Sequence, residues 1–530
     1  MDLDKLNAPA DIPQPSAGPR ITRLMHLIWL SRPDVQTVFD LRSDESRKGF
    51  VAWYFASGSI EYRLDSRFYP AGPSAGAAPP GSAGPVRLGG WKGPLLRLAL
   101  GAQPLARKAV RSLLPEKTRK RLRAWSYRAL AKLGANARVH ARAAPPRHKD
   151  GGQAAVSARK DARPGVNIVG YPRAELGMGE QHRSFAQAMV AEEIPFGNVD
   201  MGRTLSSRQE DSSCVGPFLH EAAHKANVFH VNAEQMSTVF CQLGPEFFEG
   251  RYNIGCWLWE LSRCPPEWVT SAQLVDEIWA VSRFVQSAFE GAAGVPVTYM
   301  PGGVSVRQKP QGCRRESFGL PADRYLFLFT FDFFSFIDRK NPFACIEAFR
   351  KAFPRDFQGA GLVIKCMNGE ESSPKWKRMM ELVNGDKRVY IINEVFDKSA
   401  ILGLTDVCDC FLSLHRSEGF GLGPAQAMLL GKPVIVTNYS GNTDFTRPEN
   451  SCLVNYRLIP VLEGEYPFFA GQAWADPDVE HAAWYMRKLV ADPAWGKSLG
   501  AAGAACVESQ YNARVIGERY RTRLERLHLI

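Results

Sequence analysis

Short apolar segments that alternate with helical patterns constrain the fold of this chain more than any other feature. Five such segments lie between residues 166 and 301, and six more lie between residues 325 and 454. Near-continuous apolar strands separated by helices are typical of parallel sheets that are covered on both faces. The pattern therefore predicts an α/β protein with two doubly wound, Rossmann-like domains facing a cleft, where open α/β domains bind ligands.

We expect four segments along the 530 residues. In the first, hydrophobic periodicity between residues 20 and 66 predicts helices, one of them capped by Asp44 and ending at Gly58. Between residues 71 and 85 the chain is almost entirely Ala, Gly, Pro and Ser, which cannot form a packed core. The segments are a helical appendage (1–70), a flexible and basic linker (71–164), a first Rossmann-like domain (165–305) and a second one with a closing helix (306–530).

Residues 92–149 carry sixteen Lys and Arg but only one acidic residue, Glu116, and so account for the net charge of +12 of the whole chain. Two interpretations stay open. Leu, Val and Trp mixed with cations at helical spacing suit an anionic membrane surface, and they suit a solvated helical linker equally well. We expect no nucleic-acid partner, because no nucleic-acid-reading motif accompanies the charge.

The eleven cysteines are scattered without a CxxC pair, which predicts reduced thiols. No charged-then-apolar leader opens the chain, and its longest apolar run, Tyr325–Ile337, contains Asp332. We therefore expect a cytoplasmic protein, located peripherally at the inner membrane face if the basic segment binds lipid.

Two segments have the composition of a diphosphate site. In SEGFGLGPAQAM, Glu418 leads into a glycine-rich turn that opens a helix, whose free N–H groups and dipole suit phosphates. In DRKNP, Arg339 and Lys340 precede a helix that begins near Pro342. Lys365 lies at another strand end, although surface solvation explains any single Lys or Arg as well.

The first domain offers weaker candidates. Gly177 and Gly179 precede a helix, but His182 replaces the third glycine of a dinucleotide fingerprint, which argues against a nicotinamide enzyme. His230 ends an apolar strand, where a structural hydrogen-bonding role is the common alternative. Glu260 lies among tryptophans of the kind that stack on sugars, yet core packing is the default for those aromatics.

Glu418 with Gln426 eight positions later, set in FLSLHRSEGFGLGPAQAM and followed by SGNTDFTRPENSCLVNY, resembles a known signature. It looks like that of retaining glycosyltransferase family 4 (glycosyl transferases group 1), which has the glycosyltransferase-B fold. The similarity is to the bacterial branch that builds O-antigens, capsules and exopolysaccharides. It covers about residues 165–520 and implies an acceptor-side first domain and a nucleotide-sugar-binding second domain.

The resemblance also implies a role for each candidate residue. Glu418 would contact the donor hexose, and Gln426 the ribose diol, where the family has a glutamate. His230 would contact the donor sugar, while Lys340 and Arg339, helped by Lys365, would neutralise the leaving diphosphate. The two glycine loops would face the donor phosphates through Gly177, Gly179, Gly419, Phe420, Gly421 and Leu422.

These roles predict a retaining hexosyltransferase that acts on a nucleotide sugar and a saccharide acceptor, linked in this branch to a polyprenyl diphosphate. We expect no cofactor and no metal, because Asp476-Pro477-Asp478 reads as a turn or helix cap. The alternative is a weak or inactive sugar-nucleotide-binding scaffold of the same fold, since an amide at Gln426 offers one acceptor where a carboxylate offers two.

Overall fold

The computed structural model describes residues 3–16, 19–58, 62, 64, 68, 162–202, 208–307, 309 and 311–530. The predicted linker at 71–85 and the basic segment at 92–149 lie outside these ranges. The chain divides into two compact units. One contains residues 1–160 and 233–251, and the other contains residues 161–232 and 252–530.

The N-terminal unit is helical, and it includes residues 233–251, which we expected in the first Rossmann-like domain. Its helices are α1 (Arg23–Leu30), α2 (Pro33–Gln36), α3 (Asp44–Trp53), α9 (Met236–Leu243) and α10 (Pro245–Phe248). The cap of α3 is Ser43, whose hydroxyl accepts from Ser46 N, so the prediction of Asp44 was one residue late. Asp44 instead accepts from the backbone N–H of Ser16. Phe68 packs edge-on against Phe240, with ring centroids 5.7 Å apart, so residues far apart in sequence share this unit.

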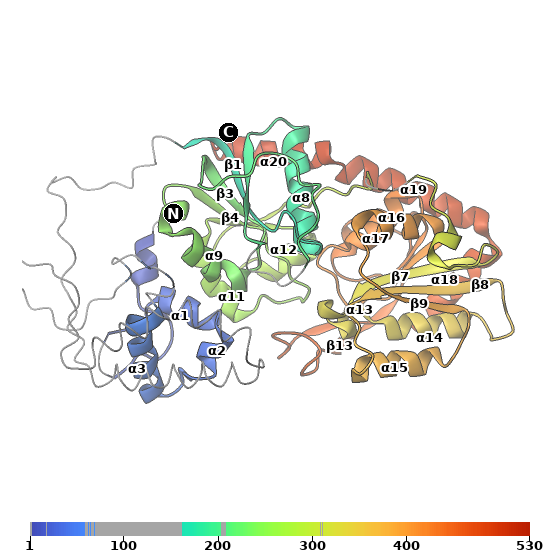
Figure 1. The fold of residues 1–530 in the computed structure, drawn as a ribbon, viewed down its shortest axis with the longest axis horizontal. Coiled ribbons are helices and arrows are strands. Elements are labelled where there is room, and N and C mark those ends of the chain that lie inside the picture. Colours follow the sequence, from blue (N-terminus) through green and yellow to red (C-terminus); the bar gives the residue numbers. More distant parts are fainter. Residues whose placement is uncertain are drawn as a thin grey trace, which may run out of the picture. The chain divides into compact units, whose positions relative to one another are not determined.

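The second unit contains two six-stranded parallel sheets (Figure 1). The first has the order β2-β1-β3-β4-β5-β6. Its strands are β1 (Arg163–Gly170), β2 (Phe196–Asp200), β3 (His224–Phe229), β4 (Tyr252–Gly255), β5 (Glu277–Ala280) and β6 (Val297–Tyr299). Buried Asn167, Asn227 and Asn253 bond in series across β1, β3 and β4, so that polar side chains fix the strand register.

The second sheet has the order β12-β11-β10-β7-β8-β9. Its strands are β7 (Tyr325–Asp332), β8 (Ala360–Met367), β9 (Val389–Asn393), β10 (Cys410–Ser413), β11 (Val434–Thr437) and β12 (Cys452–Val454). The chain enters at β7 in the middle, runs outward to β9 and returns at β10 beside β7. An antiparallel hairpin, β13 (Tyr456–Pro460) and β14 (Ala473–Pro477), follows β12.

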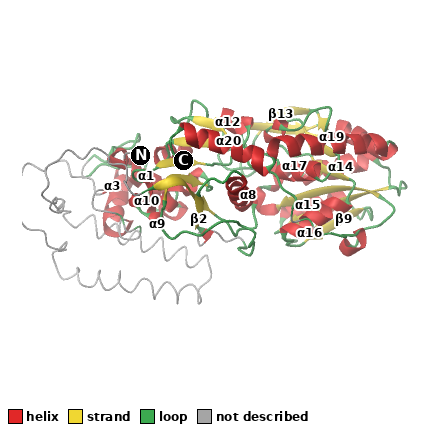
Figure 2. Ribbon diagram, turned by 90° about the horizontal axis from the view of Figure 1, so that it is seen from above, coloured by secondary structure: helices red, strands yellow, loops and turns green. Residues whose placement is uncertain are grey.

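Helices flank the strands of both α/β domains (Figure 2). The first domain has α8 (Gly177–Ala191), α11 (Pro266–Ser271) and α12 (Arg283–Phe289). The second has α13 (Ile337–Lys340), α14 (Pro342–Ala352), α15 (Pro374–Val383), α16 (Lys398–Val407), α17 (Leu422–Leu429), α18 (Val479–Ala491) and α19 (Pro493–Tyr511). The helix predicted near Pro342 and the final helical run predicted from about Glu480 are both present.

The last helix, α20 (Ala513–Arg526), returns to the first domain and packs against α8. The ring of Tyr520 stacks on Trp279, 5.4 Å away, and its hydroxyl donates to Pro301 O at 2.7 Å. Buried apolar residues form a continuous cluster that extends from Ile168 of the first sheet to Leu326 of the second. The two α/β domains therefore share a hydrophobic core as well as two chain crossings.

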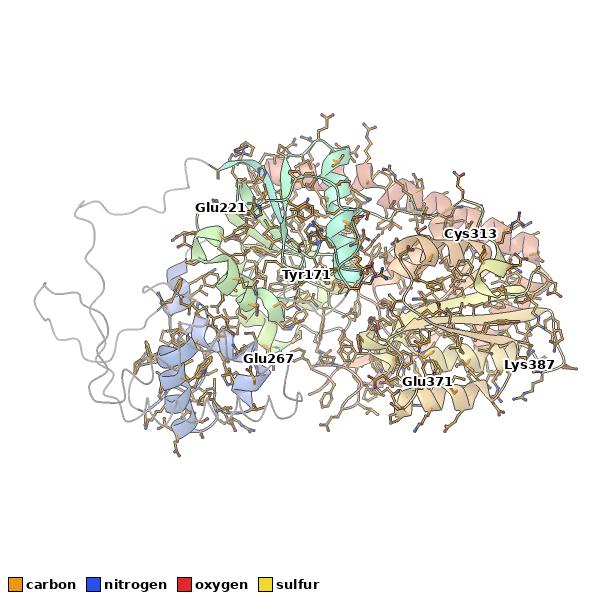
Figure 3. All side chains as sticks on the ribbon, viewed as in Figure 1. Tyr171, Glu221, Glu267, Cys313, Glu371 and Lys387 are labelled. Carbon is orange, nitrogen blue, oxygen red and sulfur yellow. The ribbon has the colours of Figure 1, made fainter. Side chains whose placement is uncertain are left out.

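All eleven cysteines, among them Cys313 (Figure 3), are free thiols, as predicted. Among the residues that the structure describes, no helix is both long and apolar enough to cross a membrane.

Candidate functional site

The strand order of the second sheet reverses between β7 and β10, and the segments that leave these two strands carry the site. β7 leads through Phe333–Ser335 into α13, and β10 leads through residues 414–421 into α17. The backbone N–H of Arg416 donates to Arg339 O at 2.8 Å, which joins the two segments. Chain segments that diverge from neighbouring parallel strands open a crevice at the carboxyl ends, where α/β domains bind ligands.

Glu418 meets both predicted cations at this crevice. Its Oε1 lies 2.5 Å from Lys340 Nζ, and its Oε2 lies 3.2 Å from the Arg339 guanidinium. Burial raises the pKa of Glu418, but the two cations outweigh burial and lower it to about 2. Burial lowers the pKa of Lys340 against the opposing attraction of Glu418. Glu418 therefore remains ionised throughout the physiological pH range.

Arg339 is nearly buried, with 6% of its side chain exposed, and only part of its hydrogen-bonding capacity is used. One terminal nitrogen donates to Ser417 O at 3.0 Å and to Glu418, and the other lies 3.9 Å from Glu260 Oε1. Its Nε has no partner. Burial lowers the pKa of Arg339, but Glu260 and Glu418 outweigh burial and raise it. Arg339 is therefore a nearly buried cation held between two carboxylates at the cavity wall.

The glycine-rich turn is shaped by close backbone approach. A Cβ on Gly419 would lie 3.3 Å from the carbonyl oxygen of Trp259, and Ser282 Oγ donates to Gly419 O at 2.6 Å. Gly421 has a φ of 94° and starts α17 without a side-chain cap. Only glycine adopts such a conformation at no steric cost, and the uncapped start leaves the first N–H groups of α17 free of any capping side chain. This turn lies beside the two cations, and we refer to the turn, Arg339 and Lys340 together as the cradle, after the diphosphate site that the sequence predicts.

A cavity of about 660 Å³ contains the cradle, and both α/β domains line it. The first domain contributes residues 175–178, Glu180, Gln181, Ser184, Arg208, Asn232, Leu258, Glu260 and the crossing segment at Gly302 and Gly303. The second contributes residues that follow β7, β8, β9 and β10. The volume is in the range of ordinary small-molecule sites.

Most of the predicted site residues meet here. Those that line the cavity are Gly177, Arg339, Lys340, Glu418, Gly419, Phe420, Gly421 and Leu422. His230, Gly179, Lys365 and Gln426 do not line it.

His230 is buried in the first domain behind the cavity. Its ring packs 4.9 Å from Phe185 and 5.8 Å from His182, and burial lowers its pKa. His182 in turn bonds to Asn198 Oδ1 at 2.9 Å. The structure thus places His230 in an aromatic core rather than on the cavity wall.

Gly177 and Gly179 lie in the first turn of α8 and not before it as predicted, and the two glycines have different roles. The loop after Tyr171 (Figure 3) turns tightly, and a Cβ on Gly179 would lie 2.1 Å from Ala174 O. A Cβ on Gly177 would have no atom within 4 Å, and Gly177 faces the cavity. Gly179 therefore permits the packing of the loop on α8, whereas Gly177 leaves open space beside the cradle.

The Lys365 side chain contacts an aromatic ring and does not line the cavity. Its Nζ lies 5.3 Å from the Phe396 ring centroid. Burial lowers its pKa. Asp332 and Asn368, which are bonded to each other at 2.8 Å, line this side of the cavity instead.

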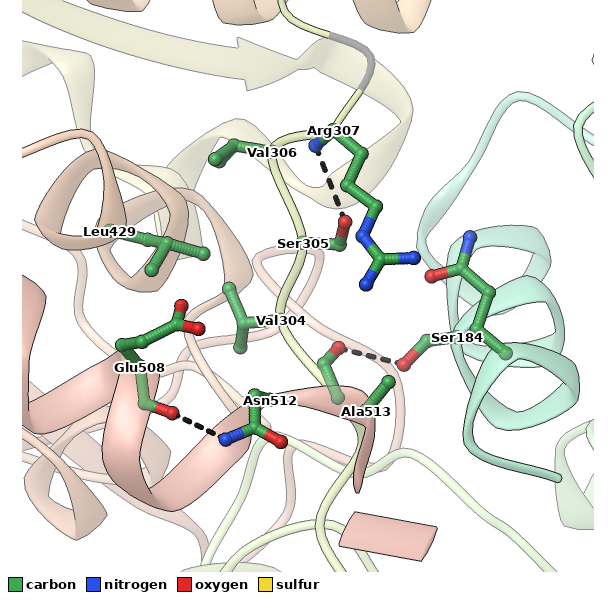
Figure 4. Close-up of a pocket in the computed structure, with 11 residues that line it drawn as sticks. Ser184, Val304, Ser305, Val306, Arg307, Leu429, Glu508, Asn512 and Ala513 are labelled. Carbon is green, nitrogen blue, oxygen red and sulfur yellow. Dashed lines mark hydrogen bonds between the residues drawn. The ribbon is translucent and has the colours of Figure 1, made fainter. Parts of the chain in front are cut away.

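Gln426 points to the domain crossing. Its Nε2 donates to Ser305 O at 3.3 Å. Ser305 lines a second cavity of about 340 Å³, between α8, the crossing segment after β6 and the junction of α19 with α20 (Figure 4). Ser184 and Gly303, bonded at 2.7 Å, border both cavities. Gln426, which we expected at the ribose of the donor, therefore contacts the segment that connects the two domains.

Two further residues, Ser440 and Tyr466, contact the acidic residues of the site but were not among the predicted site residues. Ser440, which has a φ of 71°, accepts from Glu418 N at 2.8 Å and fixes the start of the glycine-rich turn. Tyr466, in the β13–β14 connection, donates to Glu260. Ser440 is the first residue of the segment SGNTDF, which belongs to the recognised signature. No sequence pattern, by contrast, indicates that the β13–β14 connection contacts Glu260.

The Asp476-Pro477-Asp478 segment lies outside the cavity. Asp476 pairs with Arg457 and Arg416, and Asp478 caps α18, as the sequence indicated. Across the described ranges, no group of three or more His, Cys, Asp and Glu side chains is arranged to hold a metal ion.

Comparison with known proteins gives a family match for part of the chain and similar folds. Residues 315–503 match the family described as Glycosyl transferases group 1. No curated protein matches the chain. Sucrose-phosphate synthase from Thermosynechococcus elongatus is 16% identical, with a TM-score of 0.50 over 69% of this chain and 99% of that one. Anabaena Alr3699/HepE in complex with UDP and glucose is 14% identical, with a TM-score of 0.51 over 68% and 100%.

At these identities the two structures show the fold alone. They confirm the predicted α/β architecture of two Rossmann-like domains, the glycosyltransferase-B fold. The matched family supports the expectation of a glycosyltransferase.

Proposed function

From a glycosyltransferase domain with this cradle, we propose that the chain transfers a hexose from a nucleotide sugar to a saccharide acceptor, with retention and without a metal. The observation that carries the proposal is Arg339. Its guanidinium is almost buried, and Arg339 lines the cavity beside Lys340. Two adjacent cations on a cavity wall suit the two phosphates of a nucleoside diphosphate.

In the proposed reaction the bond between the anomeric carbon and the phosphate oxygen breaks, and a bond to the acceptor oxygen forms. The acceptor proton leaves with the nucleoside diphosphate. Lys340, Arg339 and the N–H groups at the start of α17 stabilise the negative charge that develops on the diphosphate. Glu418, held ionised, accepts from hexose hydroxyls and fixes the sugar over the glycine-rich turn.

Retention and a lipid-linked acceptor are parts of the proposal that rest on the sequence resemblance. A polyprenyl-diphosphate acceptor in bacterial surface polysaccharide synthesis would give residues 92–149 a purpose, because sixteen cations attract an anionic membrane. The anomeric configuration of the product, measured by NMR, tests retention.

Calorimetric titration of the full chain with UDP, GDP, ADP and dTDP, in EDTA, tests the donor site. UDP is tried first, because the structure of Alr3699/HepE holds UDP. We expect one nucleotide to bind selectively and Lys340→Ala to weaken it at least about tenfold, the usual scale for a lost charge-assisted bond. Lys375→Ala, which removes a cation paired with Asp338 outside the cavity, is the matched control. If a folded sample binds none of the four nucleotides, the donor site is refuted.

The second candidate is a sugar-nucleotide-binding scaffold, favoured by the contact of Gln426 with Ser305 instead of the cavity. Glu418→Ala separates the two functions. It abolishes transfer in an enzyme, whereas the biological role of a scaffold survives it.

A further inference from the structure

Glu260 is a first-domain carboxylate that lies among the groups of the second-domain cradle. Its Oε2 accepts from Tyr466 Oη at 2.5 Å, and its Oε1 lies 3.9 Å from the Arg339 guanidinium. Its Cγ is 3.8 Å from the point where a Cβ on Gly419 would lie. Glu260 also lines the cavity. It therefore faces the same space as Glu418, from the opposite domain.

The loop that carries Glu260 is fixed on both sides. Leu258 N donates to Asn232 Oδ1 at 3.0 Å, and Trp259 Nε1 donates to Arg263 O at 2.8 Å. From the second domain, Gln472 Nε2 donates to the same Arg263 oxygen at 2.8 Å. A side chain on so constrained a loop is preorganised, which is the usual property of a group that orients a ligand.

The charge of Glu260 opposes the binding of a bare diphosphate. Without a ligand, the cations Arg339 and Lys340 are balanced by the carboxylates Glu418 and Glu260. Each phosphate that approaches Arg339 is repelled by Glu260 a few ångströms away. A hexose, by contrast, is neutral and carries hydroxyl donors, which a carboxylate binds through charge-assisted hydrogen bonds.

We propose that Glu260 is a specificity-determining residue that binds the hexose hydroxyls of the donor and disfavours the nucleoside diphosphate product. The inference rests on the proposed function and adds a first-domain contact to it. Tyr466 is a positioning residue, because its hydroxyl orients the Glu260 carboxylate toward the sugar. The pair favours entry of the nucleotide sugar and release of the nucleotide after transfer.

Calorimetric titration of the full chain with UDP and UDP-glucose, and with GDP and GDP-mannose as a second matched pair, tests the inference. For the nucleotide that the native chain binds, we expect Glu260→Gln to bind the diphosphate about threefold more tightly and the sugar nucleotide about tenfold more weakly. The two changes have opposite signs, which a purely structural role cannot produce. Glu290→Gln, which removes an exposed charge of the same domain, is expected to change neither affinity.

Tyr466→Phe gives a second, milder test, since it keeps every charge. We expect it to weaken the sugar nucleotide about threefold and leave the bare diphosphate unchanged. Changes of the same sign for both ligands in Glu260→Gln, or no change, would overturn the inference and leave the donor site intact. Failure of the folded native chain to bind any of UDP, GDP, ADP and dTDP, with or without an attached hexose, would instead overturn the proposed function, and the inference with it.

Discussion

At the scale of residues, the site is a cluster of two cations, Arg339 and Lys340, and two carboxylates, Glu260 and Glu418. Glu418 and Lys340 satisfy each other, whereas Arg339 retains an unpaired Nε although it is almost buried. Its place on the cavity wall distinguishes Arg339 from a structural cation such as Arg388, which pairs with Asp386 and also bonds to three backbone carbonyls.

The lowered pKa of Glu418 predicts a pH-dependent contribution to stability. Its carboxyl has a pKa of about 2 in the fold and an ordinary value of 4.5, so its contribution is complete above pH 4.5 and is lost as the pH falls toward 2. The contribution amounts to about 3 kcal/mol. We expect the gap in urea midpoint between the native chain and Glu418→Gln, followed by tryptophan fluorescence, to shrink from pH 6 to pH 3.

A suitable control is Glu371→Gln, the same charge change at an exposed position (Figure 3). Its midpoint is expected to follow that of the native chain at both pH values. A Glu418→Gln gap that is equally large at pH 6 and pH 3 would contradict the prediction.

At the scale of elements, glycines at the starts of α17 and α8 either leave space at the cavity or permit close backbone packing. The start of α17 is left-handed at Gly421 and has no capping side chain, so its first turn is available to a ligand. The start of α8 combines a packing glycine, Gly179, with an open one, Gly177. Neighbouring glycines of one motif thus serve different purposes.

Substitution of the two α8 glycines separates these purposes. Gly179→Ala places a methyl group against Ala174 O, so we expect a loss of about 1–3 kcal/mol and a lower thermal midpoint in scanning fluorimetry. Gly177→Ala meets no atom within 4 Å and is expected to preserve the midpoint while weakening nucleotide binding. Equal midpoints for the two variants would refute this assignment.

At the scale of the whole second unit, polar ties join the α/β domains around the cavity. Ser282 Oγ bonds Gly419 O, Arg283 N donates to Asp444 at 2.9 Å, and Glu180 pairs with Lys398 at 2.8 Å. The Glu180–Lys398 pair joins the first turns of α8 and α16. The domains also share α20 and the crossing segment, and Gly303 of that segment borders both cavities.

Removal of the Glu180–Lys398 tie tests this coupling. In Lys398→Met, Glu180 keeps its partner Arg183 at 3.0 Å, so the first domain stays folded. The pair is partly exposed and contributes on the order of 1 kcal/mol. We expect the amides in the first turns of α8 and α16 to exchange with solvent about fivefold faster in mass-spectrometric measurements.

Lys351→Met is the matched control, since the Lys351–Glu480 pair lies within the second domain. Its effect is expected to stay local to α14 and α18. Unchanged exchange at both α8 and α16 in Lys398→Met would show that the pair does not tie the domains.

The sequence alone determined the two parallel-sheet domains and the cluster of Arg339, Lys340 and Glu418. Strand periodicity is local, and the carboxyl ends of parallel strands converge at one edge, so residues that follow β7 and β10 must meet. Only the tertiary structure decided the orientation of individual side chains. His230 follows an apolar strand, yet its ring packs against those of Phe185 and His182. Gln426 donates a hydrogen bond to Ser305 in the segment that connects the domains. Such choices depend on long-range packing, as does the return of Tyr466 to Glu260 from a hairpin some 200 residues away in the sequence.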